Sequence, residues 1–199
     1  MITPGLVFYP GIHMSPVIEK VRAYAAKAHE GQRRRYVSEP YIVHPERVME
    51  RCRQHSASVP VLSAALLHDV LEDTAVTQEQ LHEFLLSVMS ETDAAATLQI
   101  VIELTDVYVK SAYPQWNRRT RKNKEADRIA GTSPEAQTIK YADIIENCTG
   151  IAEDDPEFGP RFLRECKALL TRISKGNPIL YKQAKDVVTE ELAKLPRIQ

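Results

Sequence analysis

The sequence predicts an all-α fold, a single helical bundle, on the basis of three observations. Apolar residues recur at steps of three and four along most of the chain, as they do on the buried face of a helix. Capping side chains followed by proline mark several helix starts. No segment shows the sustained alternation of apolar and polar residues that is typical of a strand, and no Asn-Gly or Asp-Gly hairpin turn occurs. We therefore expect no sheet of consequence.

The helix boundaries follow from these signals. Starts are predicted at Ser15-Pro16, Ser133-Pro134, Asp155-Pro156 and Asn177-Pro178, and at a capping box formed by Thr77 and Gln80. Glycines 31, 150 and 176 stand where helices should end. The segment 61–71 is apolar nearly all round, which predicts one central buried helix. The least regular region, 106–133, is expected to be a partly mobile loop with a short helix around 119–130.

Length and charge limit the classes of partner. The 199 residues suffice for one domain, 1–199, with its motifs within 15–150 and carboxyl-terminal helices over 156–195. Lys and Arg number 26 against 27 Asp and Glu, so we expect neither a nucleic acid polymer nor a membrane as partner. The chain has no bilayer-length apolar run, no signal peptide and no CxxC spacing, which indicates a cytoplasmic protein with buried thiols. A homo-oligomer is left open.

The strongest chemical signal is the segment 67–74, which holds His68, Asp69, Glu72 and Asp73 directly after an apolar run. On one helix these four side chains fall within a sector of about 140°. An uncompensated buried charge costs several kcal/mol, so a divalent cation is the simplest compensation. A helix end with solvated acids would explain Glu72 and Asp73, but it would not explain the His68-Asp69 pair.

Two further residues are candidate ligands because one helix cannot surround a metal ion alone. His44 ends a short apolar run and directly precedes a predicted helix, although a core or capping histidine would look the same. Asp143 interrupts an apolar helix face, with Asn147 one turn further on the same side. A helix N-terminus or an arginine could satisfy this aspartate instead.

Four segments in this order resemble the hydrolase half of the Rel/Spo alarmone enzymes and, more narrowly, the free-standing small alarmone hydrolases of the HD type. They are Ala28–Gln32, Glu39–Pro45, Ala64–Thr74 and Ile139–Asp143. The resemblance covers about residues 15–150, and the HDxxED element is its most specific part. It implies an HD-domain helical bundle.

The resemblance also implies a chemistry. One Mn²⁺ ion would be held by His44, His68, Asp69 and Asp143, while Glu72 and Asp73 would activate or orient the attacking water. A mixed set of imidazole and carboxylate ligands suits Mn²⁺ with open positions. Coordination lowers the pKa of bound water, and a neighbouring carboxylate within reach can take its proton.

Basic residues should contact the phosphates of the substrate. Arg34 and Arg35 are our candidates from the run 33–35, together with Lys140 and Asn147, although each arginine could equally be a solvated surface charge. This segment departs from the family pattern: it is one residue longer than we expect, and Ser38 stands where a glycine is usual. The basic run 117–122 could be a lid over the phosphates or an exposed loop.

The expected substrate is a small phosphorylated nucleotide. We expect hydrolysis of the 3′-pyrophosphate of guanosine 3′,5′-bispyrophosphate or its pentaphosphate relative, with release of pyrophosphate and no synthetase activity. Adenosine alarmones and the 2′-phosphate of NADPH are alternative substrates. A non-catalytic alarmone-binding module and a purely structural helical protein are the alternatives from other classes.

Overall fold

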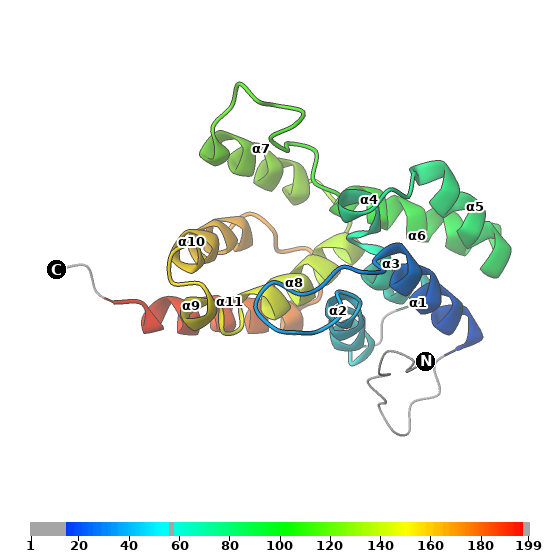
Figure 1. Ribbon diagram of the computed structural model, residues 1–199, viewed down its shortest axis with the longest axis horizontal. Helices are drawn as coiled ribbons and strands as arrows, with labels where there is room; N and C mark the ends of the chain where they lie inside the picture. The colour runs from blue at the N-terminus through cyan, green and yellow to red at the C-terminus, as the bar shows by residue number, and fades with distance from the viewer. Residues whose placement is uncertain (1–14, 56–57, 197–199) are drawn as a thin grey trace.

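The computed structural model describes residues 15–55 and 58–196, and within these ranges it confirms the all-α prediction (Figure 1). The described residues form eleven helices and no strand beyond one isolated bridge between Arg33 and Pro40. The amino-terminal residues, where we expect no signal peptide, lie outside the described ranges. The helices are α1 (Pro16–Ala28), α2 (Val43–Arg53), α3 (Val59–Leu67), α4 (Val70–Asp73), α5 (Gln78–Val88), α6 (Glu91–Leu104), α7 (Arg118–Ala130), α8 (Pro134–Cys148), α9 (Ile151–Asp154), α10 (Gly159–Leu170) and α11 (Pro178–Lys194).

Most predicted helix starts are confirmed by hydrogen bonds. The side chains of Ser15, Ser133 and Asn177 accept from backbone N–H groups in the first turns of α1, α8 and α11. Thr77 and Gln80 form both bonds of the capping box at α5. The prediction at Asp155-Pro156 is wrong by three residues, because Asp155 instead accepts from the N–H of Phe158 in a turn that precedes α10.

The predicted continuous helix over 61–71 is also wrong. Helix α3 ends at Leu67, α4 begins at Val70, and His68 and Asp69 form the break between them. The cause is a side chain that competes with the backbone: Nδ1 of His68 donates to the carbonyl of Ala65 at 2.8 Å. The carbonyl of Asp69 then accepts from the next turn, at 2.8 Å from the N–H of Asp73. The four ionisable residues therefore do not share one helix face.

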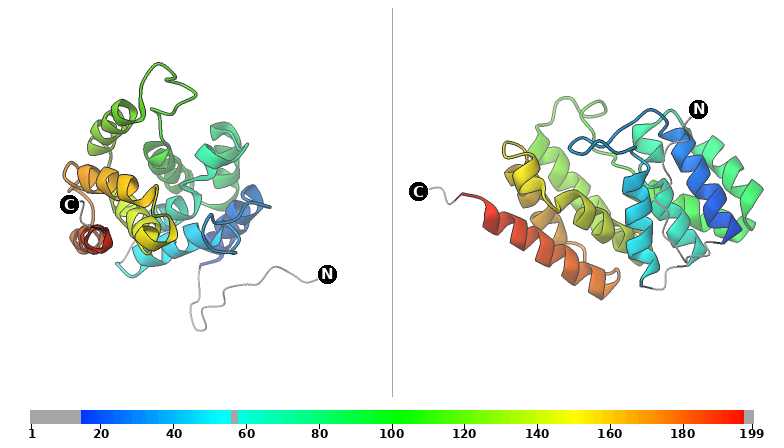
Figure 2. Two further views of the ribbon diagram at one scale, coloured as in Figure 1. Left: turned by 60° about the vertical axis from the view of Figure 1, so that its left-hand side comes forward. Right: turned by 60° about the horizontal axis from the view of Figure 1, so that its bottom comes forward.

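Helix α8 lies between two groups of helices (Figures 1 and 2). Ile139 and Ala142 of α8 belong to a core that α1, α2, α3, α5 and α6 complete. Tyr141, Ile144 and Cys148 of the same helix belong to a second core, formed mainly with α10 and α11. Both cores therefore depend on α8, which also carries one of the predicted metal ligands.

Helix α7 confirms the short helix predicted around 119–130, and a buried carboxylate fixes the segment before it. Glu125 is 3% exposed, and its Oε2 accepts from the N–H groups of Val107 and Tyr108 at 3.0 Å each. Arg118 at the start of α7 forms two hydrogen bonds with Glu165 of α10, at 2.8 and 2.7 Å. The expected mobility of this region stays a prediction. None of the helices in the described ranges combines the length and hydrophobicity needed to cross a bilayer.

We predict that Leu66→Ala lowers the free energy of unfolding by about 2–5 kcal/mol, because this fully buried side chain of α3 would leave a cavity in the first core. Leu86→Ala is the matched control, since Leu86 is 44% exposed and should change stability far less. Denaturant unfolding followed by circular dichroism measures both variants. Equal losses in the two would contradict the described core.

Candidate metal-dependent active site

The four predicted metal ligands converge. His44 lies in the first turn of α2, His68 and Asp69 form the break between α3 and α4, and Asp143 lies in the middle of α8. Nε2 of His44 is 3.2 Å from Oδ1 of Asp143 and 3.7 Å from Oδ2 of Asp69. Nε2 of His68 is 3.1 Å from Oδ2 of Asp69 and 3.7 Å from Oδ1 of Asp143. Two imidazole nitrogens thus face two carboxylate oxygens.

This arrangement calls for a cation. Because Nδ1 of His68 donates to Ala65, Nε2 faces the carboxylates, where a neutral ring would offer its lone pair to a metal ion; this buried atom has no hydrogen-bond partner within the described ranges. Burial by itself would lower the pKa of His68, but the charges of Asp69 and Asp143 outweigh it and raise the pKa to about 10. The two carboxylates therefore favour a positive charge at this position, which a proton or a metal ion supplies. The donor set fits a divalent ion, and ligand atoms of His44, His68 and Asp69 all lie within 4.8 Å of one another.

Asp143 has partners on both carboxylate oxygens. Its Oδ1 accepts from Nδ2 of Asn147 at 2.5 Å and faces the imidazole of His44. Its Oδ2 accepts from the ammonium of Lys140 at 2.9 Å. Burial opposes ionisation of Asp143, but Lys140 and the two histidines hold the pKa of this carboxyl well below its usual range. Asn147 and Lys140, predicted as substrate contacts, thus lie beside the metal ligands.

Tyr41 is a site residue to which the sequence analysis gave no role. Its hydroxyl donates to Oδ2 of Asp69 at 2.7 Å and lies 3.2 Å from Oδ2 of Asp73. Its ring packs on the buried imidazole of His29, with centroids 4.6 Å apart. Burial and the adjacent charge of Asp69 raise the pKa of Tyr41, so this residue remains a donor. The spacing of 28 residues between Tyr41 and Asp69 gave no signal of the contact.

The two predicted catalytic acids have different surroundings. Glu72 lines a cavity beside the cluster together with Asp69 and Asp143, and its Oε2 accepts from the N–H of Asp106 at 3.2 Å. Burial, helped by the charge of Asp106, raises the pKa of Glu72 to about 7. Asp73 is close to Tyr41, and burial and the charge of Asp69 raise its pKa. A carboxyl that titrates near neutrality beside a metal centre is suited to proton transfer.

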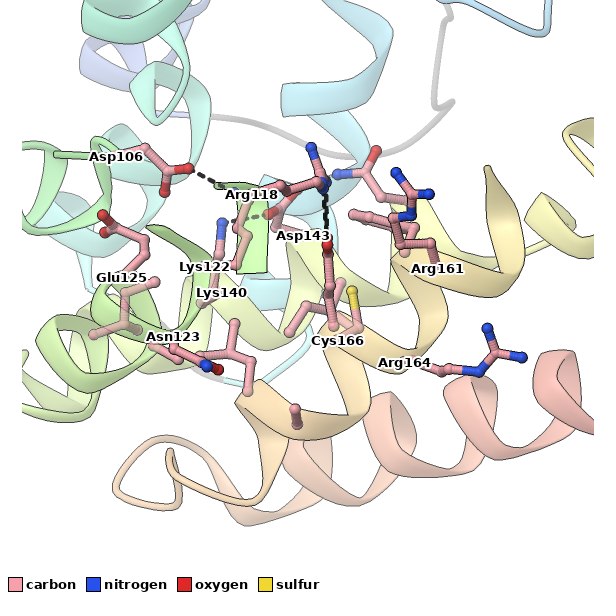
Figure 3. A pocket seen from close by; sticks show the side chains of 18 of the residues that line it. Asp106, Arg118, Lys122, Asn123, Glu125, Lys140, Asp143, Arg161, Arg164 and Cys166 are labelled. Atoms are coloured by element: carbon pink, nitrogen blue, oxygen red, sulfur yellow. Dashed lines mark hydrogen bonds and ion pairs between the residues drawn. The ribbon is translucent and has the colours of Figure 1, made fainter. Parts of the chain in front are cut away.

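A cavity of about 1100 Å³ opens from the metal cluster toward α7 and α10 (Figure 3). Its acidic lining residues are Asp69, Glu72, Asp106, Glu125, Asp143 and Glu165. Its basic lining residues are Arg118, Arg119, Lys122, Lys140, Arg161, Arg164 and Arg172. The arginines of α10 were missed because the carboxyl-terminal helices carry no recognisable motif. The basic run 117–122 lies at the start of α7 and contributes Arg118, Arg119 and Lys122 to this wall.

The three arginines of the run 33–35 point to different places. Arg33 bonds within its own loop to Ser38, at 2.8 Å from the hydroxyl. Arg34 donates to Oδ1 of Asn147 at 3.2 Å, which brings it beside the metal cluster. The Arg35 side chain is 71% exposed and lies 3.4 Å from Asp155. All three line a second cavity of about 850 Å³, which shares Tyr41 and Asn147 with the first. The role of Arg34 and Arg35 in substrate binding stays a prediction.

A helical domain with a buried centre of two histidines and two aspartates defines a class of metal-dependent hydrolases. A family model described as "HD domain" matches residues 22–169, and the chain belongs to this family. The human protein named guanosine-3′,5′-bis(diphosphate) 3′-pyrophosphohydrolase MESH1 is 32% identical over 138 residues, which are 67% of this chain and 69% of the relative.

Two further comparisons agree with this assignment. A protein of Vibrio cholerae, named guanosine-3′,5′-bis(diphosphate) 3′-pyrophosphohydrolase, is 46% identical over 69 residues, 33% of this chain and 10% of the relative. The chain spans about a tenth of the length of such long bacterial relatives. A solved structure described as a metazoan ortholog of SpoT that hydrolyses ppGpp superposes with a TM-score of 0.75 at 23% identity, covering 90% of this chain and 98% of that one. This likeness confirms the fold.

We predict that Mn²⁺ raises the midpoint of thermal unfolding of the metal-free protein, because the ion binds the assembled cluster and not the unfolded chain. His44→Ala should abolish the shift, since it removes one of the two facing imidazoles. His82→Ala is the control, because His82 lies on α5 away from the cluster, and it should keep the shift. A shift that survives in His44→Ala would show that this imidazole is not a ligand.

Proposed function

We propose that the protein hydrolyses the 3′-pyrophosphate of guanosine 3′,5′-bispyrophosphate and its pentaphosphate relative, and releases pyrophosphate. The observation that carries this proposal is the meeting of His44, His68, Asp69 and Asp143 beside Glu72, in a cavity with basic walls. Relatives named for this reaction, one of them matched over two thirds of its length, support the choice of substrate. A compact anionic nucleotide suits such a cavity.

The metal centre has a defined role in this proposal. His44, His68, Asp69 and Asp143 would hold one Mn²⁺ ion, which lowers the pKa of bound water and polarises a phosphoryl oxygen. The bond between His68 and Ala65 fixes the ring of this ligand, and Asn147 and Lys140 fix the carboxylate of Asp143. The choice of Mn²⁺ over other divalent ions is part of the proposal.

Side chains beside the metal ligands would activate the water and bind the nucleotide. Glu72 accepts the proton of the attacking water, and Asp73, joined through Tyr41 to Asp69, orients that water. Arg34 and Asn147 hold a phosphate or ribose oxygen at the junction of the two cavities, with Arg35 at the rim. Asp143 uses one donor of the Lys140 ammonium, so the other donors remain for a phosphate oxygen.

The proposal also includes the cellular compartment and the partner of the protein. Cys52, Cys148 and Cys166 are free and buried, which suits the reducing cytoplasm where we place the protein. The partner is a small nucleotide, and a homo-oligomer stays a prediction. Hydrolysis of adenosine alarmones or of the 2′-phosphate of NADPH, and alarmone binding without turnover, are the outcomes that would replace this proposal.

We predict that the purified protein with Mn²⁺ releases pyrophosphate from guanosine 3′,5′-bispyrophosphate, measured by ion chromatography beside NADPH and adenosine alarmones as rival substrates. EDTA should stop the reaction because it removes the ion, and Asp69→Ala should abolish it because one ligand is lost. The control Asp186→Ala changes an exposed acid of α11 and should leave the rate unchanged. Turnover of a rival substrate alone would reject the guanosine substrate.

We predict that Glu72→Gln lowers kcat about 10²- to 10⁴-fold while Mn²⁺ binding is kept, because the base is lost and the ligands are not. A general base works when deprotonated, so activity is present above its pKa and lost as pH falls through it. In the metal-free protein that pKa is about 7, and a bound cation lowers it, so the acid limb of kcat/KM should lie at or below pH 7. Wild-type kcat in Glu72→Gln would exclude this base.

A further inference from the structure

A lysine ammonium lies beside the candidate metal ligands and donates to Oδ2 of Asp143, the carboxylate oxygen that does not face His44. Lys140 comes three residues before Asp143 on α8, and its Nζ is 2.9 Å from Oδ2 (Figure 3). The other oxygen, Oδ1, lies 3.2 Å from Nε2 of His44. The Lys140 side chain is only 20% exposed and the Asp143 side chain only 10%. One carboxylate therefore faces the metal position with one oxygen and an ammonium with the other.

Further acidic residues line the same cavity. Glu72 and Asp106 line the same cavity as Lys140, and the N–H of Asp106 is 3.2 Å from Oε2 of Glu72, which brings the two acidic residues together. The cavity therefore holds a fixed positive charge among oxygen ligands of the kind that divalent ions prefer.

Centres with two metal ions place them about 3.5–4 Å apart and clamp both oxygens of the reacting phosphate. A carboxylate such as Asp143, with its two oxygens turned to different cation positions, is suited to bridge such a pair. Glu72 would supply an outer ligand of the second ion, whereas Oδ2 of Asp106 already accepts from Nζ of Lys122 at 2.8 Å. In this chain, the ammonium of Lys140 occupies that outer side of Asp143 instead.

We propose that the ammonium of Lys140 occupies the position that a second metal ion would take on Oδ2 of Asp143, and that it thereby limits the centre to one divalent ion. The proposal rests on the metal centre of the proposed function and adds its stoichiometry. Two positive charges on opposite oxygens of one buried carboxylate repel each other, and a second divalent ion in place of the ammonium would have to displace it. A simple structural ion pair would have another consequence: loss of the lysine would weaken binding of the single ion without adding a second.

The count of bound ions separates these two roles. Metal-free protein is dialysed against MnCl₂, bound manganese is measured by elemental analysis, and electron paramagnetic resonance detects spin coupling between neighbouring ions. We expect about one ion in the wild type and about two coupled ions in Lys140→Met. Lys140→Arg keeps the charge and should stay at about one. Lys182→Met removes an exposed lysine of α11 and is the matched control, which should also stay at about one.

A single ion in Lys140→Met, or two ions in the wild type, would overturn the proposal. Circular dichroism checks that each variant is folded. If Lys140→Met does not fold, Lys140→Gln, which removes the charge but keeps a donor for Asp143, takes its place, and the wild-type count still decides. The counts need no nucleotide, so the two proposals can fail separately. A protein that binds one ion but leaves the alarmone intact loses only the proposed function, whereas a protein that binds none loses both.

Discussion

The candidate site depends on the meeting of two buried imidazoles and two carboxylates, an arrangement that favours a positive charge between them. Three separate parts of the chain bring Nε2 of His44 and of His68 within 3.1 to 3.7 Å of carboxylate oxygens of Asp69 and Asp143. Such a concentration of ionisable groups is costly unless each is paired, and the buried Nε2 of His68 has no hydrogen-bond partner in the described residues. The surrounding hydrogen bonds, from Tyr41 to the bond between His68 and Ala65, orient the cluster.

The sequence was sufficient to predict the fold class and the convergence of the four candidate ligands. Capping residues such as Ser133 and Asn177 act within a few residues, so their pattern is local and can be recognised directly. The His68-Asp69 pair was recognisable because ionisable residues directly follow an apolar run, and the family resemblance then joined His44 and Asp143 to it. These predictions needed no knowledge of how the helices pack.

The rest of the site depends on contacts that local patterns do not encode. The break at His68 arises because an imidazole takes a backbone carbonyl that a neighbouring N–H would otherwise use, and helical periodicity cannot show that competition. Tyr41 precedes α2 and Asp69 follows α3, so their contact depends on how these two helices pack. The roles of Arg33 and Arg34 differ because the loop between α1 and α2 turns the first back on Ser38 and the second toward Asn147.

The position of α8 between the two cores has a thermodynamic consequence. Ile139 and Ala142 stabilise one half of the molecule, Tyr141 and Ile144 stabilise the other, and Asp143 lies between them in the sequence of the same helix. If either core unfolds, α8 loses the apolar contacts on that side, and α8 also packs in the other core. Ligand binding at the candidate site and folding of the carboxyl-terminal helices are therefore coupled. A ligand that binds the folded site should stabilise both cores and make unfolding more cooperative.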